Sequence, residues 1–174
     1  MSAHHPRRTA LRLAAVAAPA TLLLTGCLSG QGHVGLHASG HFTAGQKFPT
    51  AQITWCGDAP PAQIDLVSDD HSWRLTATEE FTGGEVEVDL SAPGEAWEIT
   101  DGDGRAAYRV VPASPETEYT LGVSTETVEA GDEPSHDVAD LAFTTGALAA
   151  EDGVYASDGD EGRMVSAEEF PPEC

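Results

Sequence analysis

The sequence is poor in basic side chains: 8 Lys and Arg residues stand against 29 Asp and Glu residues. Three of the basic residues lie within the first twelve positions, so the chain after residue 26 carries 5 basic and 29 acidic side chains, a net charge of −24. Such a surface repels phosphates, which excludes nucleic-acid binding. The charge favours a solvated, self-repelling surface, and attraction to cations or basic partners is the alternative.

Long hydrophobic runs are also lacking, with one exception near the N-terminus. The apolar stretch from Leu13 to Leu24 is too short to span a bilayer comfortably, and no other segment approaches that length. A basic segment from His4 to Arg12 precedes it. A basic start followed by a short apolar run is the layout of a secretory signal, here residues 1–26, which is removed from the mature protein.

The tetrapeptide Leu24–Cys27, with the sequence Leu-Thr-Gly-Cys, resembles the lipobox of bacterial lipoproteins. The resemblance implies that signal peptidase II cleaves between Gly26 and Cys27 and that Cys27 carries lipid, palmitate included. Two acyl chains anchor a protein stably where one is marginal, at about 0.8 kcal/mol per buried methylene. We therefore expect a lipid anchor on the outer face of the cell membrane, reached by general or by twin-arginine secretion.

The mature chain divides into three parts by its pattern. Residues 27–45 hold five glycines and no sustained periodicity, so a lipidated cysteine with a flexible, disordered tether is expected. Residues 46–147 alternate apolar and polar positions between turn signals, which predicts an antiparallel β-sandwich domain. Residues 148–174 form an acidic extension folded back on that domain. The expected strands centre on Ile53–Trp55, Ile64–Leu66, Trp73–Ala77, Val86–Leu90, Trp97–Ile99, Tyr108–Val110, Tyr119–Val123 and Leu141–Phe143.

The segment Val111–Val123 resembles the corner between strands E and F of fibronectin type III domains. The resemblance implies an immunoglobulin-like or fibronectin-like sandwich in which the Tyr119 hydroxyl bonds back to the preceding backbone. Ile53–Trp55, followed by two prolines, is similar to the strand B tryptophan of the same family, and Phe143–Thr145 resembles a terminal strand. These motifs are packing signatures and carry no chemistry.

Only three cysteines are present, and Cys27 is the lipid acceptor. The remaining two, Cys56 and Cys174, are expected to form a disulfide, because an exported compartment permits oxidation. The bridge would close a loop of more than 100 residues and stabilise the fold by about 4 to 5 kcal/mol in the chain-entropy model. Two unpaired thiols are the alternative.

Three histidines, His33, His37 and His41, recur at every fourth position and are weak candidates for zinc or copper ligands. The glycines among them argue against a helix that would align them, so a solvated linker is favoured and no cofactor or metal is expected. Two acidic segments are weaker candidates for calcium. The first, Asp101–Gly104, reads better as a hairpin turn, and the second holds Asp158, Asp160 and Glu161.

No catalytic set stands out. The run Ser68–Ser72 places the residue types of a catalytic triad side by side, but neighbouring side chains of a strand point to opposite faces. The three tryptophans, Trp55, Trp73 and Trp97, could line a carbohydrate platform, but they occupy the apolar side of their alternations and are expected in the core.

The leading hypothesis is a non-enzymatic, lipid-anchored surface lipoprotein whose sandwich acts in binding or in envelope structure. Its expected partners are the membrane, through lipid on Cys27, and an unknown protein or surface ligand. One alternative is an accessory lipoprotein that captures a metal ion through the tether histidines or the acidic loops. Another is a small extracytoplasmic enzyme.

Overall fold

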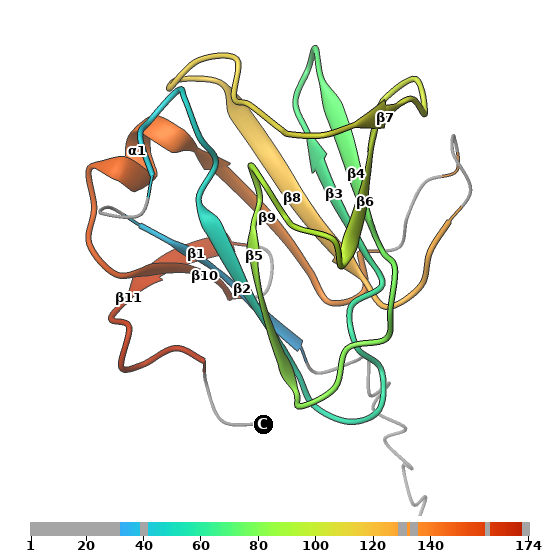
Figure 1. The fold of residues 1–174 in the computed structure, drawn as a ribbon. Coiled ribbons are helices and arrows are strands. Elements are labelled where there is room, and N and C mark those ends of the chain that lie inside the picture. Colours follow the sequence, from blue (N-terminus) through green and yellow to red (C-terminus); the bar gives the residue numbers. More distant parts are fainter. Residues whose placement is uncertain (1–31, 39–41, 129–131, 133–135, 159–160, 172–174) are drawn as a thin grey trace, which may run out of the picture.

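The computed structural model describes residues 32–38, 42–128, 132, 136–158 and 161–171, which form two antiparallel sheets packed face to face (Figure 1). The expected β-sandwich is therefore confirmed. The first sheet has the order β11-β10-β1-β2-β5 and the second the order β7-β6-β4-β3-β8-β9. The first contains β1 (Gly32–His37), β2 (Thr50–Trp55), β5 (Glu85–Asp89), β10 (Val154–Asp158) and β11 (Glu161–Val165). The second contains β3 (Gln63–Val67), β4 (Ser72–Ala77), β6 (Trp97–Asp101), β7 (Ala106–Ala107), β8 (Glu118–Ser124) and β9 (Ala139–Thr144), and a short helix, α1 (Thr145–Ala149), follows β9.

The space between the sheets is filled by side chains that alternate along the strands. On β8, Tyr119, Leu121 and Val123 are completely buried, whereas Thr120 between them points outward and is half-buried. The Phe48 ring meets that of Tyr119 edge-on, with ring centres 4.7 Å apart. Burying one such side chain contributes roughly 1.5 to 3 kcal/mol, so the alternation decides which face of each strand turns inward.

The expected tyrosine bond is present at the start of β8. The backbone N–H of Ala113 donates a hydrogen bond to the Tyr119 hydroxyl oxygen at 2.7 Å. Because the Tyr119 ring is fixed in the core, this bond ties the segment before β8 to the sandwich.

The expectation of a flexible tether over residues 27–45 is wrong for residues 32–37, in the middle of that segment. Residues Gly32–His37 form β1, which pairs with both β2 and β10, and Val34 and Leu36 are fully buried. The glycines that suggested flexibility are required by packing. A Cβ at Gly35 would lie 2.8 Å from the Phe170 ring, so only glycine allows that ring to cover β1.

The expected domain boundaries at residues 46 and 147 are also wrong. Beyond residue 147, β10 and β11 complete the first sheet, with β10 paired to β1 and β11 paired to β10. Val154, Ala156, Val165 and Phe170 form a small second core. The sandwich therefore includes described residues from 32 to 171.

One expected strand is absent where the alternation suggested it. Tyr108 follows the two-residue strand β7 and is 94% exposed, while Val110 is buried and its N–H donates to the Ser91 carbonyl oxygen. This segment joins the outer edge of the second sheet to the end of β5. The tryptophans behave as expected, since Trp55 and Trp97 are buried and Trp73 packs against the core.

Replacing Tyr119 with Phe should lower the free energy of unfolding by about 1 kcal/mol, because the ring stays packed while the Ala113 N–H loses its acceptor. Urea titration followed by tryptophan fluorescence measures the change. Tyr108→Phe is the matched control, since it removes a hydroxyl from an exposed side chain and should leave stability unchanged. An unchanged urea midpoint for Tyr119→Phe would contradict the role given to this bond.

Candidate functional site

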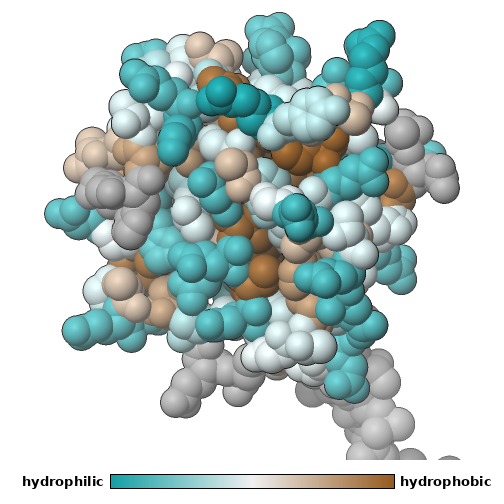
Figure 2. All heavy atoms as spheres, viewed as in Figure 1, coloured by the Kyte–Doolittle hydropathy of each residue, from teal (hydrophilic) through white to brown (hydrophobic). Residues whose placement is uncertain are grey.

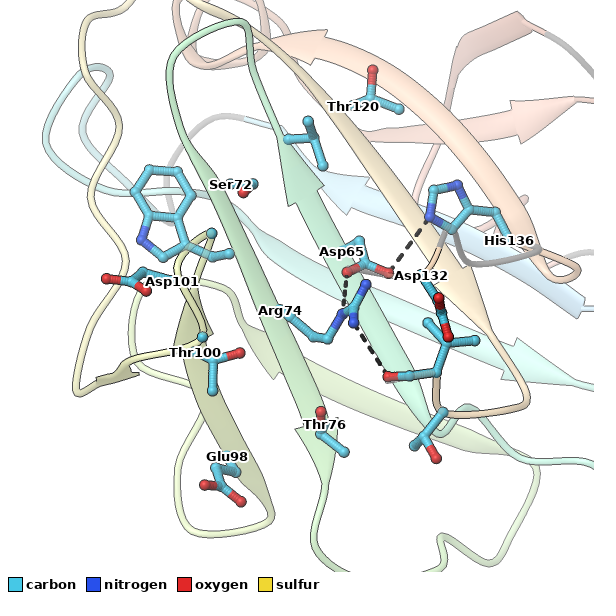
Figure 3. Close-up of a pocket in the computed structure, with 16 residues that line it drawn as sticks. Asp65, Ser72, Arg74, Thr76, Glu98, Thr100, Asp101, Thr120, Asp132 and His136 are labelled. Carbon is cyan, nitrogen blue, oxygen red and sulfur yellow. Dashed lines mark hydrogen bonds and ion pairs between the residues drawn. The ribbon is translucent and has the colours of Figure 1, made fainter. Parts of the chain in front are cut away.

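The outward face of the second sheet carries an open groove of about 980 Å³. The groove crosses β6, β4, β3 and β8, so its floor consists of the side chains that alternate with the core residues. One wall is the turn between β6 and β7, and the other comes from the connection between β8 and β9 (Figure 3). Figure 3 labels ten of its residues: Asp65, Ser72, Arg74, Thr76, Glu98, Thr100, Asp101, Thr120, Asp132 and His136.

The centre of the floor is an ion pair between neighbouring strands. Asp65 of β3 lies directly opposite Arg74 of β4, and the Arg74 Nε donates to the Asp65 Oδ1 at 2.8 Å. The other carboxylate oxygen, Oδ2, accepts a hydrogen bond from the Gln63 side-chain amide at 2.6 Å. The Asp65 side chain is only 7% exposed, so its charge would be costly without these partners.

Two of these three side chains, Arg74 and Gln63, hold the connection between β8 and β9. Arg74 donates from Nη1 to the Val128 carbonyl oxygen at 3.2 Å, and the Val128 N–H donates to the Gln63 Oε1 at 3.0 Å. Both backbone groups of Val128 are thus satisfied by the floor. The wall of the groove is therefore positioned by the polar residues at its centre.

His136, on the same connection, approaches Asp65 from the other side. Its Nε2 lies 3.6 Å from the Asp65 Oδ2, and its Nδ1 lies 4.0 Å from the Asp140 Oδ2. Nε2 is shielded from solvent and has no hydrogen-bond partner within the described part of the chain. The Asp65 carboxylate is thus the charge that this nitrogen faces.

Glycine at position 122 makes this approach possible. Gly122 lies opposite Asp65 on β8, and a Cβ there would overlap the His136 imidazole. His136 itself has a positive φ of 42°, a conformation that costs energy for a residue with a side chain. The His136 N–H donates to the Ser124 Oγ at 3.1 Å and helps to hold this conformation.

For both Asp65 and His136, the neighbouring polar and charged groups shift the pKa in the direction opposite to burial. Burial raises the pKa of Asp65, but the combined effect of His136, Arg74 and Gln63 is larger and places that pKa below its ordinary value of 3.8. The Asp65 carboxylate raises the pKa of His136 above 6.5, although burial acts in the opposite direction. The two shifts describe one interaction, in which ionised Asp65 and protonated His136 stabilise each other.

The tether histidines do not meet at one point. His33 and His37 lie on β1, four residues apart on one face, which corresponds to about 13 Å along a strand. They cannot share a metal ion at that separation, and the His37 Nε2 lies instead 3.4 Å from a Glu87 carboxylate oxygen. His41 lies outside the described residues. Within the described residues, no three His, Cys, Asp or Glu side chains are grouped as metal ligands.

The first acidic segment forms the expected hairpin turn. Asp101 Oδ1 accepts hydrogen bonds from the N–H groups of Asp103 and Arg105, and the Arg105 side chain pairs with Asp103. These bonds hold the tight turn between β6 and β7. In the second segment, the side chains of Asp158, Asp160 and Glu161 lie outside the described residues.

The run from Ser68 to Ser72 forms the turn between β3 and β4, not a catalytic relay. The Ser68 hydroxyl and the backbone of His71 bond to each other at 3.2 Å. The His71 ring stacks on Trp73, with ring centres 5.7 Å apart. The His71 ring is thus packed on an aromatic side chain.

The cysteines are only partly described. Cys56 follows β2 and is not a free thiol. Gly26, Cys27 and Cys174 lie outside the described residues, so the cleavage site, the lipid acceptor and the Cys56–Cys174 pairing stay predictions.

The surface of the described residues is largely hydrophilic. Figure 2 shows hydrophilic side chains over most of the viewed face, with hydrophobic residues between them.

Comparison with protein families, with curated proteins and with solved structures finds no match to this chain. The function is therefore inferred from the residues of the groove and of the leader.

The cluster should make stability depend on pH in a defined direction. The contribution of His136 is complete below pH 6.5 and is lost as pH rises through its raised pKa. The contribution of Asp65 is present above pH 3.8 and is lost as pH falls through its lowered pKa. His136→Gln should therefore cost roughly 1 kcal/mol of unfolding free energy near pH 5 and less at alkaline pH.

Urea titrations of both proteins across this pH range measure the difference. The control is the Asp65→Asn background, in which His136→Gln should have no comparable pH-dependent effect, since its charged partner is gone. A difference between wild type and His136→Gln that is the same at every pH would contradict the pairing.

Proposed function

We propose that this protein is a lipid-anchored, extracytoplasmic, non-enzymatic binding protein, which presents the groove of the second sheet at the outer face of the cell membrane. The leader of residues 1–26, with Cys27 after its small residues, supports the anchoring. Among the described residues, no helix has both the length and the apolar character needed to cross a membrane.

The binding role is supported mainly by the floor of the groove, whose central polar side chains are hydrogen-bonded to one another. Arg74 and Gln63 both bond to Asp65 and both hold Val128, so the groove is preformed and needs no ligand to order it. The His136 Nε2 is shielded and faces Asp65, which suits a fixed floor better than proton transfer to a substrate. Small-ligand sites are usually concave and largely preformed, as this groove is.

The sandwich is inferred to be of the immunoglobulin or fibronectin type III kind. The bond from Ala113 to the Tyr119 hydroxyl supports this, because a corner tyrosine is characteristic of such folds. In those sandwiches the conserved features serve packing, and binding surfaces are built on the sheets and loops.

The expected disulfide between Cys56 and Cys174 is also supported by the course of the chain. Phe170 lies against Gly35 on the outer side of the first sheet. Trp55 pairs with Gly32, so Cys56, the next residue, lies four positions, or about 13 Å, further along the sheet than Gly35. The four residues that follow Phe170 can span a comparable distance when extended.

The anchor is tested by Cys27→Ser in cells. The thiol is the proposed lipid acceptor and lipidation precedes cleavage, so the variant should accumulate as uncleaved or mislocalised precursor. Membrane fractionation and the mass of the mature N-terminus measure this outcome, and Ser29→Ala in the same segment is the control. A Cys27→Ser protein that is processed and membrane-bound as before would refute the anchor.

The disulfide is tested by reduction. Breaking a bridge that closes a loop of more than 100 residues should lower stability by about 4 to 5 kcal/mol and depress the melting temperature markedly. Cys56→Ser should melt at the temperature of the reduced protein, with or without reductant. Two free thiols titrated in the oxidised, denatured mature protein would show that the pairing is wrong.

A further inference from the structure

We propose that the groove of the second sheet binds a neutral, hydroxyl-rich oligosaccharide. This inference rests on the binding role proposed above and adds the chemical class of the ligand. It draws on the shape of the groove, the free hydrogen-bonding groups that line it, and the sign of its charge.

The groove is an open channel across a sheet, which suits a chain-like ligand. The strand register places its outward residues in rows two residues apart, and therefore about 7 Å from one another. The first row contains Ser72 and Thr120, the second Arg74 and Thr100, and the third Thr76. Polar groups thus recur along the groove and can contact successive units of one ligand.

The hydroxyls in these rows are available. Within the described part of the chain, Ser72, Thr76, Thr100 and Thr120 make no side-chain hydrogen bond, although all four are half-buried in the groove. Each hydroxyl can both donate and accept. A sugar hydroxyl also does both, so the two sets of groups are complementary.

The charges of the groove disfavour an anionic ligand. Arg74 is engaged by Asp65 and by the Val128 carbonyl, which leaves no uncommitted guanidinium to bind a carboxylate or phosphate. Glu98, Asp101 and Asp132 line the same groove, and their carboxylates repel anions. Carboxylates accept strong, charge-assisted hydrogen bonds from neutral hydroxyl donors, which a sugar supplies.

Limited apolar surface lies among these polar groups. Val67, on the same outward face, is 40% exposed beside Ser72 and Thr120. Sugar rings have apolar C–H faces that pack on such side chains, while their hydroxyls reach the polar rows. Apolar surface combined with a few convergent polar groups is the usual composition of a small-ligand site.

The inference is tested by calorimetric titration of the full lipidated chain in a detergent without a sugar headgroup. The neutral probes are cellohexaose, chitohexaose, maltohexaose, xylohexaose and mannohexaose, with hexagalacturonate as the anionic probe and hexalysine as the cationic probe. We expect saturable binding of at least one neutral probe and none of hexagalacturonate. Thr76→Val and Thr100→Val remove only a hydroxyl and should each weaken binding about fivefold, as expected for one lost hydrogen bond.

Thr50→Val is the matched control, because it removes a hydroxyl from the first sheet, away from the groove, and should leave affinity unchanged. Failure of every neutral probe to bind would overturn the inference, as would binding that neither groove variant weakens. If hexalysine alone binds and Glu98→Gln weakens it, the sugar assignment fails while the binding role of the groove stands. If no probe of any charge binds, both fail.

Discussion

The negative charge of Asp65 sets the main constraint on the second sheet. A carboxylate that is only 7% exposed needs several partners. Asp65 accepts hydrogen bonds from Arg74 on the next strand and from Gln63 on its own strand. These two partners in turn hold Val128. The His136 ring lies over Gly122 and brings a further positive charge to Asp65 when it is protonated. The position of one wall of the groove therefore follows from one buried charge.

Much of the fold can be predicted from the sequence, and the error at β1 has a cause that local sequence cannot reveal. Alternation located the strands around Ile53, Leu75 and Leu121 because each has one buried face and one exposed face. It failed at β1, where glycine suggested flexibility although Gly35 is required by the Phe170 ring. Local composition cannot show that a glycine is needed by a residue more than a hundred positions away.

The candidate site was hidden for a related reason. In sequence, Asp65 and Arg74 are ordinary polar positions between apolar neighbours, which predicts solvent-exposed side chains. Only the register of β3 against β4 and β8 brings them together with Gly122, and register is a non-local property. The one available signal was Gly122 itself, because a glycine inside an apolar strand often marks a close approach by another group.

The place of β1 within the first sheet has a mechanical consequence. With lipid on Cys27, as proposed, any pull between the membrane and the domain enters the fold through the first residues of β1. That strand is paired on both sides, with β2 and with β10, and we consider a pull directed along its axis. The hydrogen bonds of both ladders are then loaded together in shear, so the strand resists extraction more strongly than one that could be peeled from a sheet edge one bond at a time.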